Sequence, residues 1–151
     1  MAGRLIGIAR KDRPRVPMEV IDRAEIGTEI GIAGDYRGAM HPGRVNRRQV
    51  TILLAEDWTT ALAEHGRTVP WYERRANLLV EGIVLPREEG VRVRIGNALF
   101  EITGECDPCH RMDAVSHGLQ IALRPDWRGG RTCTVIESGA IAIGDEVRIE
   151  D

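Results

Sequence analysis

The sequence predicts a mainly β protein, a barrel or a sandwich that carries some helical decoration. The apolar stretches are short, they follow one another at nearly regular spacing, and 17 glycines punctuate the chain. Short strands separated by turn residues at such intervals are typical of these folds. The length of 151 residues suits one domain with its own core, so we expect a single domain over residues 1–151.

The first third of the chain contains three predicted strands and a loop. Residues Arg4–Ala9 form an apolar stretch that ends before a segment with two prolines. Residues Val20–Ala24 and Thr28–Ala33 mix apolar and polar side chains in the manner of half-buried strands. Residues Gly34–Arg44 contain three glycines and a proline, which indicates a loop of the length that often lines a functional site.

The middle of the chain combines a predicted strand, Gln49–Leu54, with the clearest helix in the sequence. Within Ala55–Gly66, Trp58 and Ala61 have helical spacing, and acidic side chains occupy the first turn. Gly66 stands where helices commonly end, because glycine readily takes the left-handed conformation found there.

The second half of the chain continues the β pattern. Residues Asn77–Val80 and Arg131–Glu137 are predicted strands, and Arg111–Leu123 is expected to be helical in part. Residues Ile95–Ile102 and Ile143–Glu150 resemble each other, since each begins with a tight Gly-Asn or Gly-Asp turn that leads into an alternating strand. We expect these two stretches to form equivalent corners of the sheet or barrel.

Charge and composition exclude several classes of protein. The net charge is −2, although residues 1–48 contain ten basic and six acidic side chains. No dense basic face is evident and aromatic residues make up 4%, so nucleic-acid binding is not expected. No apolar run approaches the roughly 20 residues of a membrane helix. The first residues lack a signal-peptide pattern, so we expect a cytoplasmic protein with no membrane partner.

Two of the three cysteines, Cys106 and Cys109, lie in the segment GECDPCHRM. A zinc site is not favoured, because the second ligand pair is missing, and a thioredoxin-like pair is not favoured, because no βαβ pattern is present. A reactive thiolate is favoured at Cys109, because the positive charge that follows it stabilises the nucleophilic form. For Cys106 burial and function stay equally open, whereas Cys133 is expected to be a buried apolar residue.

Other polar residues are candidates for binding an anion. Arg75 and Asn77 alternate onto the same face of a predicted strand, where they offer a guanidinium and an amide to a phosphate or a pterin. Arg48 directly precedes the strand Gln49–Leu54, where it either binds an anion or is simply solvated.

Four segments, taken in order, resemble one known family. They are GDYRGAMHPGRVNRRQVTILLAEDWTTALAEHG, RRANLLVEGIVLP, IGNALFEITGECDPCHRM and the closing GAIAIGDEVRIE. Their order and spacing resemble the MOSC family, which is named after the C-terminal domain of molybdenum cofactor sulfurase, and its small stand-alone bacterial members in particular. The resemblance extends over nearly the whole chain.

The resemblance implies a distorted closed β-barrel of the pyruvate-kinase-barrel type, with one or two decorating helices. It implies that Cys109 matches the family cysteine, which carries sulfur as a persulfide or ligates molybdenum. Cys106 matches a cysteine that only some members have. The resemblance also implies a set of residues that bind the molybdenum cofactor, namely Arg48, Arg75, Asn77 and Arg111.

The resemblance implies one function and leaves two alternatives. In the first, Cys109 accepts a persulfide from a cysteine desulfurase and passes sulfur toward a metal-sulfur centre; His110 and Arg111 stabilise the thiolate, and Cys106 assists. In the second, the protein is a small reductase of N-hydroxylated compounds, and Cys109 ligates the molybdenum of a bound molybdopterin. In the third, it is a non-catalytic binding module for a desulfurase or a molybdoenzyme. The pyridoxal-phosphate module of larger relatives is not in this sequence, so we do not expect it to extract sulfur from cysteine alone.

Overall fold

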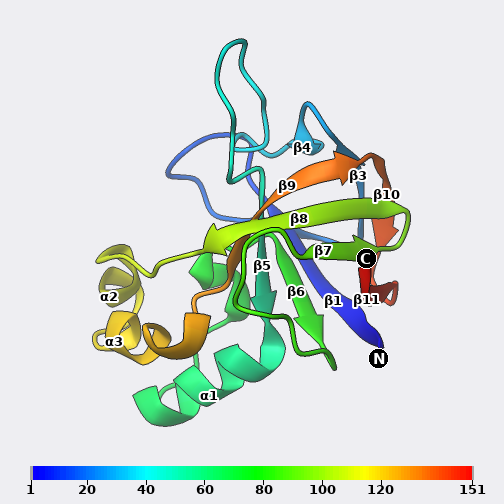
Figure 1. Cartoon of the computed structure of the whole chain (residues 1–151). Helices are drawn as coiled ribbons and strands as arrows, with labels where there is room; N and C mark the ends of the chain where they lie inside the picture. Colours follow the sequence, from blue (N-terminus) through cyan, green and yellow to red (C-terminus); the bar gives the residue numbers. More distant parts are fainter. Residues whose placement is uncertain (1, 151) are drawn as a thin grey trace.

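The computed structural model describes residues 2–150, and Figure 1 shows how they are arranged. The strands within these residues are β1 Ala2–Arg10, β2 Glu19–Ile21, β3 Arg23–Gly27, β4 Gly31–Ile32, β5 Val50–Leu54, β6 Leu78–Glu81, β7 Arg92–Ile95, β8 Ala98–Glu105, β9 Arg131–Glu137, β10 Gly139–Ala142 and β11 Glu146–Glu150. The α-helices are α1 Ala55–His65, α2 Arg111–Val115 and α3 Leu119–Leu123, and the short 3-10 helices are η1 Trp71–Arg74 and η2 Pro125–Trp127. None of the helices in this part of the chain is long and apolar enough to cross a membrane.

Seven of the described strands close into a barrel in the order β1, β11, β7, β8, β9, β5, β6. The pairing of β11 with both β1 and β7 closes the ring, and β2 pairs with the far end of β1. All neighbours in the ring are antiparallel except β5 and β6, which are parallel because α1 and η1 carry the chain back between them. The structure therefore confirms the closed β-barrel, and β3, β4 and β10 form a small separate sheet.

The apolar core has two parts, one on each side of β5. Ile52 and Phe100 belong to the cluster inside the barrel, whereas Leu53 belongs to a second cluster that includes Trp58 and Met112. Successive side chains of a strand point to opposite faces, so β5 is buried along its full length. Figure 1 shows the three α-helices gathered at one side of the barrel, close to where β8 ends.

Most predicted elements are present, with some corrections. Helix α1 ends at Gly66 in the left-handed conformation, with φ of 83°, as the sequence predicted. Residues 111–123 form two short helices, α2 and α3. The described residues therefore contain three α-helices, whereas one or two were expected. The expected strand Val20–Ala24 is interrupted at Asp22, and its two parts pair in different sheets. Strands β7 and β10 were not predicted.

Gln49 attaches the loop of residues 34–44 to the barrel. Its buried Nε2 donates hydrogen bonds to the carbonyl oxygens of Thr28 at 2.9 Å and Gly38 at 3.0 Å. Its Oε1 accepts a hydrogen bond from a backbone N–H of β9 at 2.9 Å. A Cβ at Gly38 would overlap the backbone carbonyl of Ile30, so only glycine allows this close approach. Residues 28–30 turn to meet the loop, which is why the expected strand Thr28–Ala33 is reduced to β4.

Asn77 joins three strands of the barrel through its buried side chain. Its Oδ1 accepts hydrogen bonds from the backbone N–H of Thr51 at 3.0 Å and from the Thr51 hydroxyl at 3.2 Å. Its Nδ2 donates to the carbonyl oxygen of Ala9 at 3.1 Å. The amide therefore connects the end of β1 to the starts of β5 and β6.

We expect Asn77→Ala to lower the free energy of unfolding by about 2–4 kcal/mol, since it leaves buried groups of Thr51 and Ala9 without partners. Urea denaturation measures this change. Asn97→Ala is the matched control, because Asn97 is exposed in the turn between β7 and β8. We expect that control to change the free energy by less than about 0.5 kcal/mol. Equal effects of the two variants would contradict the structural role of Asn77.

Candidate functional site

The two cysteines of the segment GECDPCHRM lie in different environments. Cys106 is 3% exposed at the end of β8, whereas Cys109 is exposed in the loop before α2. Cys133 lies in β9 inside the barrel, where burial raises the pKa of its thiol far above the ordinary value. Within residues 2–150, no three side chains of His, Cys, Asp or Glu gather in a way that could hold a metal ion. Cys109 is therefore the thiol that external molecules can reach.

Arg74 holds the buried end of this segment. Its Nε donates to the carbonyl oxygen of Gly129 at 2.9 Å, and its Nη2 donates to the carbonyl oxygen of Cys106 at 2.9 Å. The same Nη2 lies 3.4 Å from the Cys106 Sγ, within the range of a hydrogen bond to sulfur. A Cβ at Gly129 would lie 2.5 Å from the Cys106 carbonyl oxygen, so glycine is needed where β9 approaches the segment. Nothing in the sequence indicated this role of Arg74.

The exposed part of the segment is short and attached at both sides. Pro108 is buried, and its carbonyl oxygen accepts a hydrogen bond from Gln120 of α3 at 3.3 Å. Met112 is buried in the helix-side cluster, and its backbone N–H donates to the Cys109 carbonyl oxygen at 3.0 Å. Between these two contacts Cys109, His110 and Arg111 are all exposed. The loop thus presents a thiol, an imidazole and a guanidinium together to solvent.

Three arginines from different segments act electrostatically on Lys11, and one of them, Arg111, lies directly after this loop. Lys11 follows β1 and is 5% exposed. Burial, and then the positive charges of Arg75, Arg37 and Arg111, lower the pKa of Lys11 below its ordinary value. The Lys11 Nζ and the Arg37 Cζ lie 5.7 Å and 5.3 Å from the centre of the Tyr36 ring. We call Lys11, Arg37, Arg75 and Arg111 the cationic cluster.

The cationic cluster lacks partners of opposite charge. None of its four members forms an ion pair with a carboxylate of the described residues. Asp35 is close, but its Oδ1 accepts the backbone N–H of Lys11 at 3.1 Å, and its buried Oδ2 has no hydrogen-bond partner. Burial raises the pKa of Asp35, although N–H groups and nearby cations oppose that change. Unpaired cations that converge from several segments form a suitable site for an anion.

Two of the four residues that the sequence proposed for cofactor binding, Arg75 and Arg111, carry charges that act on Lys11. Arg75 follows η1 with φ of 67°, an unusual left-handed conformation for arginine, and Arg111 begins α2. The Asn77 amide is used by the strands of the barrel. Arg48 is exposed before β5, where its backbone N–H donates to Asn46, and its charge is not among those that act on Lys11.

Lys11 and Arg37 were not identified from the sequence. The signal for Lys11 was present, since it is the only lysine in a chain with 21 lysines and arginines in total. Arg37 lies in the loop 34–44, which was expected to line a site, but nothing in the sequence singles it out. Its contribution depends on Tyr36, whose hydroxyl accepts a hydrogen bond from the Arg37 Nε at 2.8 Å.

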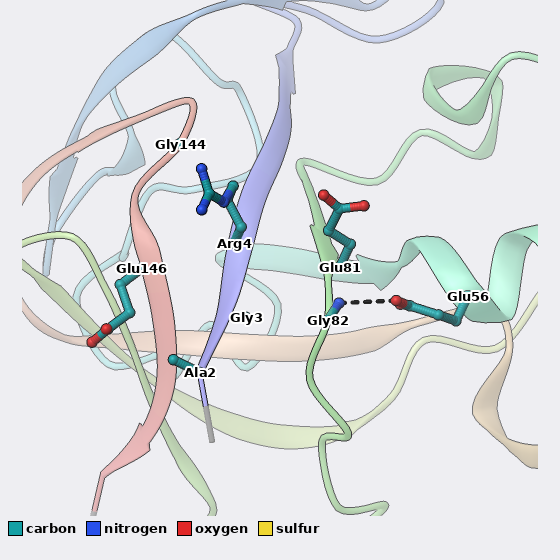
Figure 2. Close-up of a pocket in the computed structure, with 8 residues that line it drawn as sticks. All are labelled: Ala2, Gly3, Arg4, Glu56, Glu81, Gly82, Gly144 and Glu146. Atoms are coloured by element: carbon teal, nitrogen blue, oxygen red, sulfur yellow. Dashed lines mark hydrogen bonds between the residues drawn. The ribbon is translucent and has the colours of Figure 1, made fainter.

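A separate cavity of about 410 Å³ opens beside the first residues of β1. Figure 2 shows the side chains that line it, among them Arg4, Glu56, Glu81 and Glu146. The backbone N–H of Gly82 donates to the Glu56 carboxylate there at 2.9 Å. This cavity contains three carboxylates and neither cysteine nor histidine, so it does not suit thiol chemistry.

Comparisons with known proteins agree with this fold. The MOSC domain family model matches residues 37–148. The YUAD protein from Bacillus subtilis is similar in structure, with a TM-score of 0.81 and 20% identity over 97% of this chain and 94% of that chain. YiiM from Escherichia coli has a TM-score of 0.69 and 15% identity, over 98% of this chain and 70% of that chain. YiiM from Geobacillus stearothermophilus has a TM-score of 0.66 and 14% identity, over 99% and 73%. A search of curated proteins gave no match.

The structural similarities, at these low identities, show a shared fold. The family match is more informative, because it includes more than half of the chain and extends from the loop 34–44 through the cysteine segment to β11. MOSC domains are associated with the molybdenum cofactor. This match, together with the closed barrel, shows that the chain belongs to the MOSC domain family.

Proposed function

We propose that this protein handles sulfur linked to the molybdenum cofactor, with Cys109 as the thiol that carries the sulfur. The observation that supports this most directly is the contrast between the exposed Cys109 and the buried Cys106 and Cys133. A sulfur carrier must meet a donor protein and an acceptor in turn, so its thiol must be accessible. The loop is attached to the helices at Pro108 and at Met112, on either side of Cys109, and these contacts restrict the movement of the thiol.

The proposed transfer is an exchange between sulfur atoms without net oxidation. The Cys109 thiolate attacks the terminal sulfur of a persulfide on a cysteine desulfurase. A new S–S bond forms at Cys109, and the bond to the donor breaks, so the donor cysteine leaves as a thiolate. Arg111 and His110, which directly follow Cys109, stabilise the negative charge on its sulfur before and after the transfer.

The same site fits an anionic pterin cofactor. The cationic cluster offers guanidinium and ammonium groups without carboxylate partners in the described residues, which suits the phosphate of such a molecule. Arg75 and Arg111 would hold that phosphate, and Lys11 and Arg37 would add positive charge to the site. When bound, the cofactor would supply the metal-sulfur centre that accepts the sulfur. Asn77 contributes by holding the strands that precede Lys11 and follow Arg75.

A second candidate function follows from the same cluster. If the cofactor stays bound, the exposed Cys109 thiolate is a suitable soft ligand for molybdenum, and the protein is then a small reductase of N-hydroxylated compounds. The two functions differ in whether Cys109 carries sulfur or is occupied by metal. Persulfide formation on Cys109 and the molybdenum content of the purified protein distinguish them.

For the sulfur carrier, we expect intact-mass spectrometry to detect one added sulfur atom after incubation with a cysteine desulfurase and cysteine. Cys109→Ala abolishes the adduct, because it removes the accessible thiol. Cys106→Ala is the matched control, since it removes the neighbouring buried thiol, and we expect it to keep at least about half of the adduct. An adduct that forms equally well on Cys109→Ala would disprove the assignment.

For the reductase, we expect molybdenum and pterin to copurify with the protein from a host that makes the cofactor. Cys109→Ala then loses molybdenum but keeps pterin, because the cationic cluster still binds the phosphate. The double variant Arg75→Gln, Arg111→Gln loses both, whereas Arg67→Gln, an exposed arginine after α1, keeps both. Elemental analysis and pterin fluorescence give the two readouts. Absence of both molybdenum and pterin from the wild-type protein would reject this candidate.

A further inference from the structure

Another cavity, of about 490 Å³, is lined by the start of α1, the link from β6 to β7, η2 and the first residue of β9. Its volume lies within the range of small-molecule sites in proteins. The first residue of β9 is Arg131, so we call this space the Arg131 cavity. The residues that line it include no member of the cysteine segment and none of the cationic cluster, so the sulfur chemistry proposed above does not use it.

Arg131 is a buried arginine with one donor group left unpaired. Its side chain is 3% exposed. Its Nη2 donates to the carbonyl oxygen of Leu85 at 2.7 Å, and its Nε donates to the carbonyl oxygen of Pro86 at 3.5 Å. Its Nη1 has no hydrogen-bond partner within residues 2–150. A buried donor without a partner costs free energy, so an acceptor that enters the cavity beside Arg131 would be stabilised there.

Asp57, in the first turn of α1, lies next to this donor. Its Oδ2 is 3.7 Å from the Arg131 Nη1, which pairs opposite charges but is too long for a hydrogen bond. The Asp57 side chain is 27% exposed, and no hydrogen bond with residues 2–150 holds its carboxylate. The side chain can therefore rotate and let a ligand approach the covered Nη1.

Both charges are poorly hydrated in this position. Burial raises the pKa of Asp57, although the charges of nearby arginines oppose that change, and burial lowers the pKa of Arg131. A ligand that offers one acceptor and one donor would replace part of the hydration that each group has lost.

We propose that the Arg131 cavity binds small uncharged amides and lactams with an apolar body. The amide oxygen accepts a hydrogen bond from the Arg131 Nη1, and the amide N–H donates to the Asp57 carboxylate. A primary amide or a lactam presents these two groups side by side. The apolar body packs on Ile83, Val84 and Leu85, of which Val84 is 85% exposed.

The charges around the cavity favour an uncharged ligand over an anion. Arginine binds a carboxylate best through two parallel N–H groups, but only one nitrogen of Arg131 is free. The carboxylate of Asp57 repels an anion that approaches the same nitrogen. Two further arginines of the lining, Arg87 and Arg128, are each paired with a carboxylate already, at 2.8 Å and 2.7 Å.

The test compares ε-caprolactam, a cis lactam, with cycloheptanone, in which a methylene replaces the N–H of the same ring, and with the anion hexanoate. Each is titrated into the whole ¹⁵N-labelled protein, and backbone amide chemical shifts report binding. We expect saturable shifts in residues 55–60 and 82–87, which line the cavity. We expect the lactam to bind about tenfold more tightly than the ketone, because its N–H adds a hydrogen bond to a charged acceptor, and hexanoate to bind most weakly.

Asp57→Ala removes the acceptor for the N–H and leaves Arg131 in place. We expect it to lower the affinity for the lactam about tenfold and to change the affinity for the ketone by less than about twofold. The affinity for hexanoate rises, because the repulsion is lost. Glu73→Ala is the matched control, since it removes an exposed carboxylate of η1 outside the cavity, and we expect it to change none of the three affinities.

Three results would each overturn the proposal. The first is no saturable binding of the lactam at these residues. The second is a lactam affinity that equals the ketone affinity or that Asp57→Ala leaves unchanged. The third is tighter binding of hexanoate than of the lactam by the wild-type protein. None of them bears on whether Cys109 carries sulfur.

Discussion

The buried amide of Asn77 is the interaction on which the geometry of the candidate site depends. It connects the end of β1 to the starts of β5 and β6 through hydrogen bonds to Thr51 and Ala9. Lys11 follows Ala9 by two residues, and Arg75 precedes Asn77 by two. Both cations therefore leave the barrel from backbone that this amide holds. A buried amide without hydrogen-bond partners costs free energy, so these hydrogen bonds stabilise the barrel. They also hold the backbone from which Lys11 and Arg75 extend.

The two cysteines of the segment GECDPCHRM lie in different surroundings, one buried and one exposed. Arg74 binds the carbonyl oxygen of Cys106, and Gly129 allows β9 to pack closely against it. Cys109, three residues further, is exposed beside His110 and Arg111. A buried arginine without a carboxylate partner is unusual, and here its donors are used by carbonyl oxygens and sulfur. The two cysteines are thus neighbours in sequence and differ in burial and in the contacts they make.

The cationic cluster is maintained against electrostatic repulsion. Like charges oppose folding, so other contacts must compensate for the positive charges of Arg75, Arg37 and Arg111 that act on Lys11. The Tyr36 ring, next to Lys11 and Arg37, offers one such compensation. The left-handed backbone at Arg75 is a second local conflict at the same place. Departures from local preference that coincide in this way are typical of binding sites.

The sequence by itself determined the barrel and the helix α1, because these depend on local patterns, namely alternating strands and helical spacing with a terminal glycine. It also predicted Cys109 as the reactive thiol, from a cysteine that is followed by cationic side chains. It also pointed to Arg75 and Arg111. Only the tertiary structure decided that Lys11 and Arg37 join them, that Arg74 holds Cys106, and that the Asn77 amide lies between strands. The physical reason is that burial and electrostatic influence depend on chain segments that are distant in sequence, and only the folded chain brings those segments together.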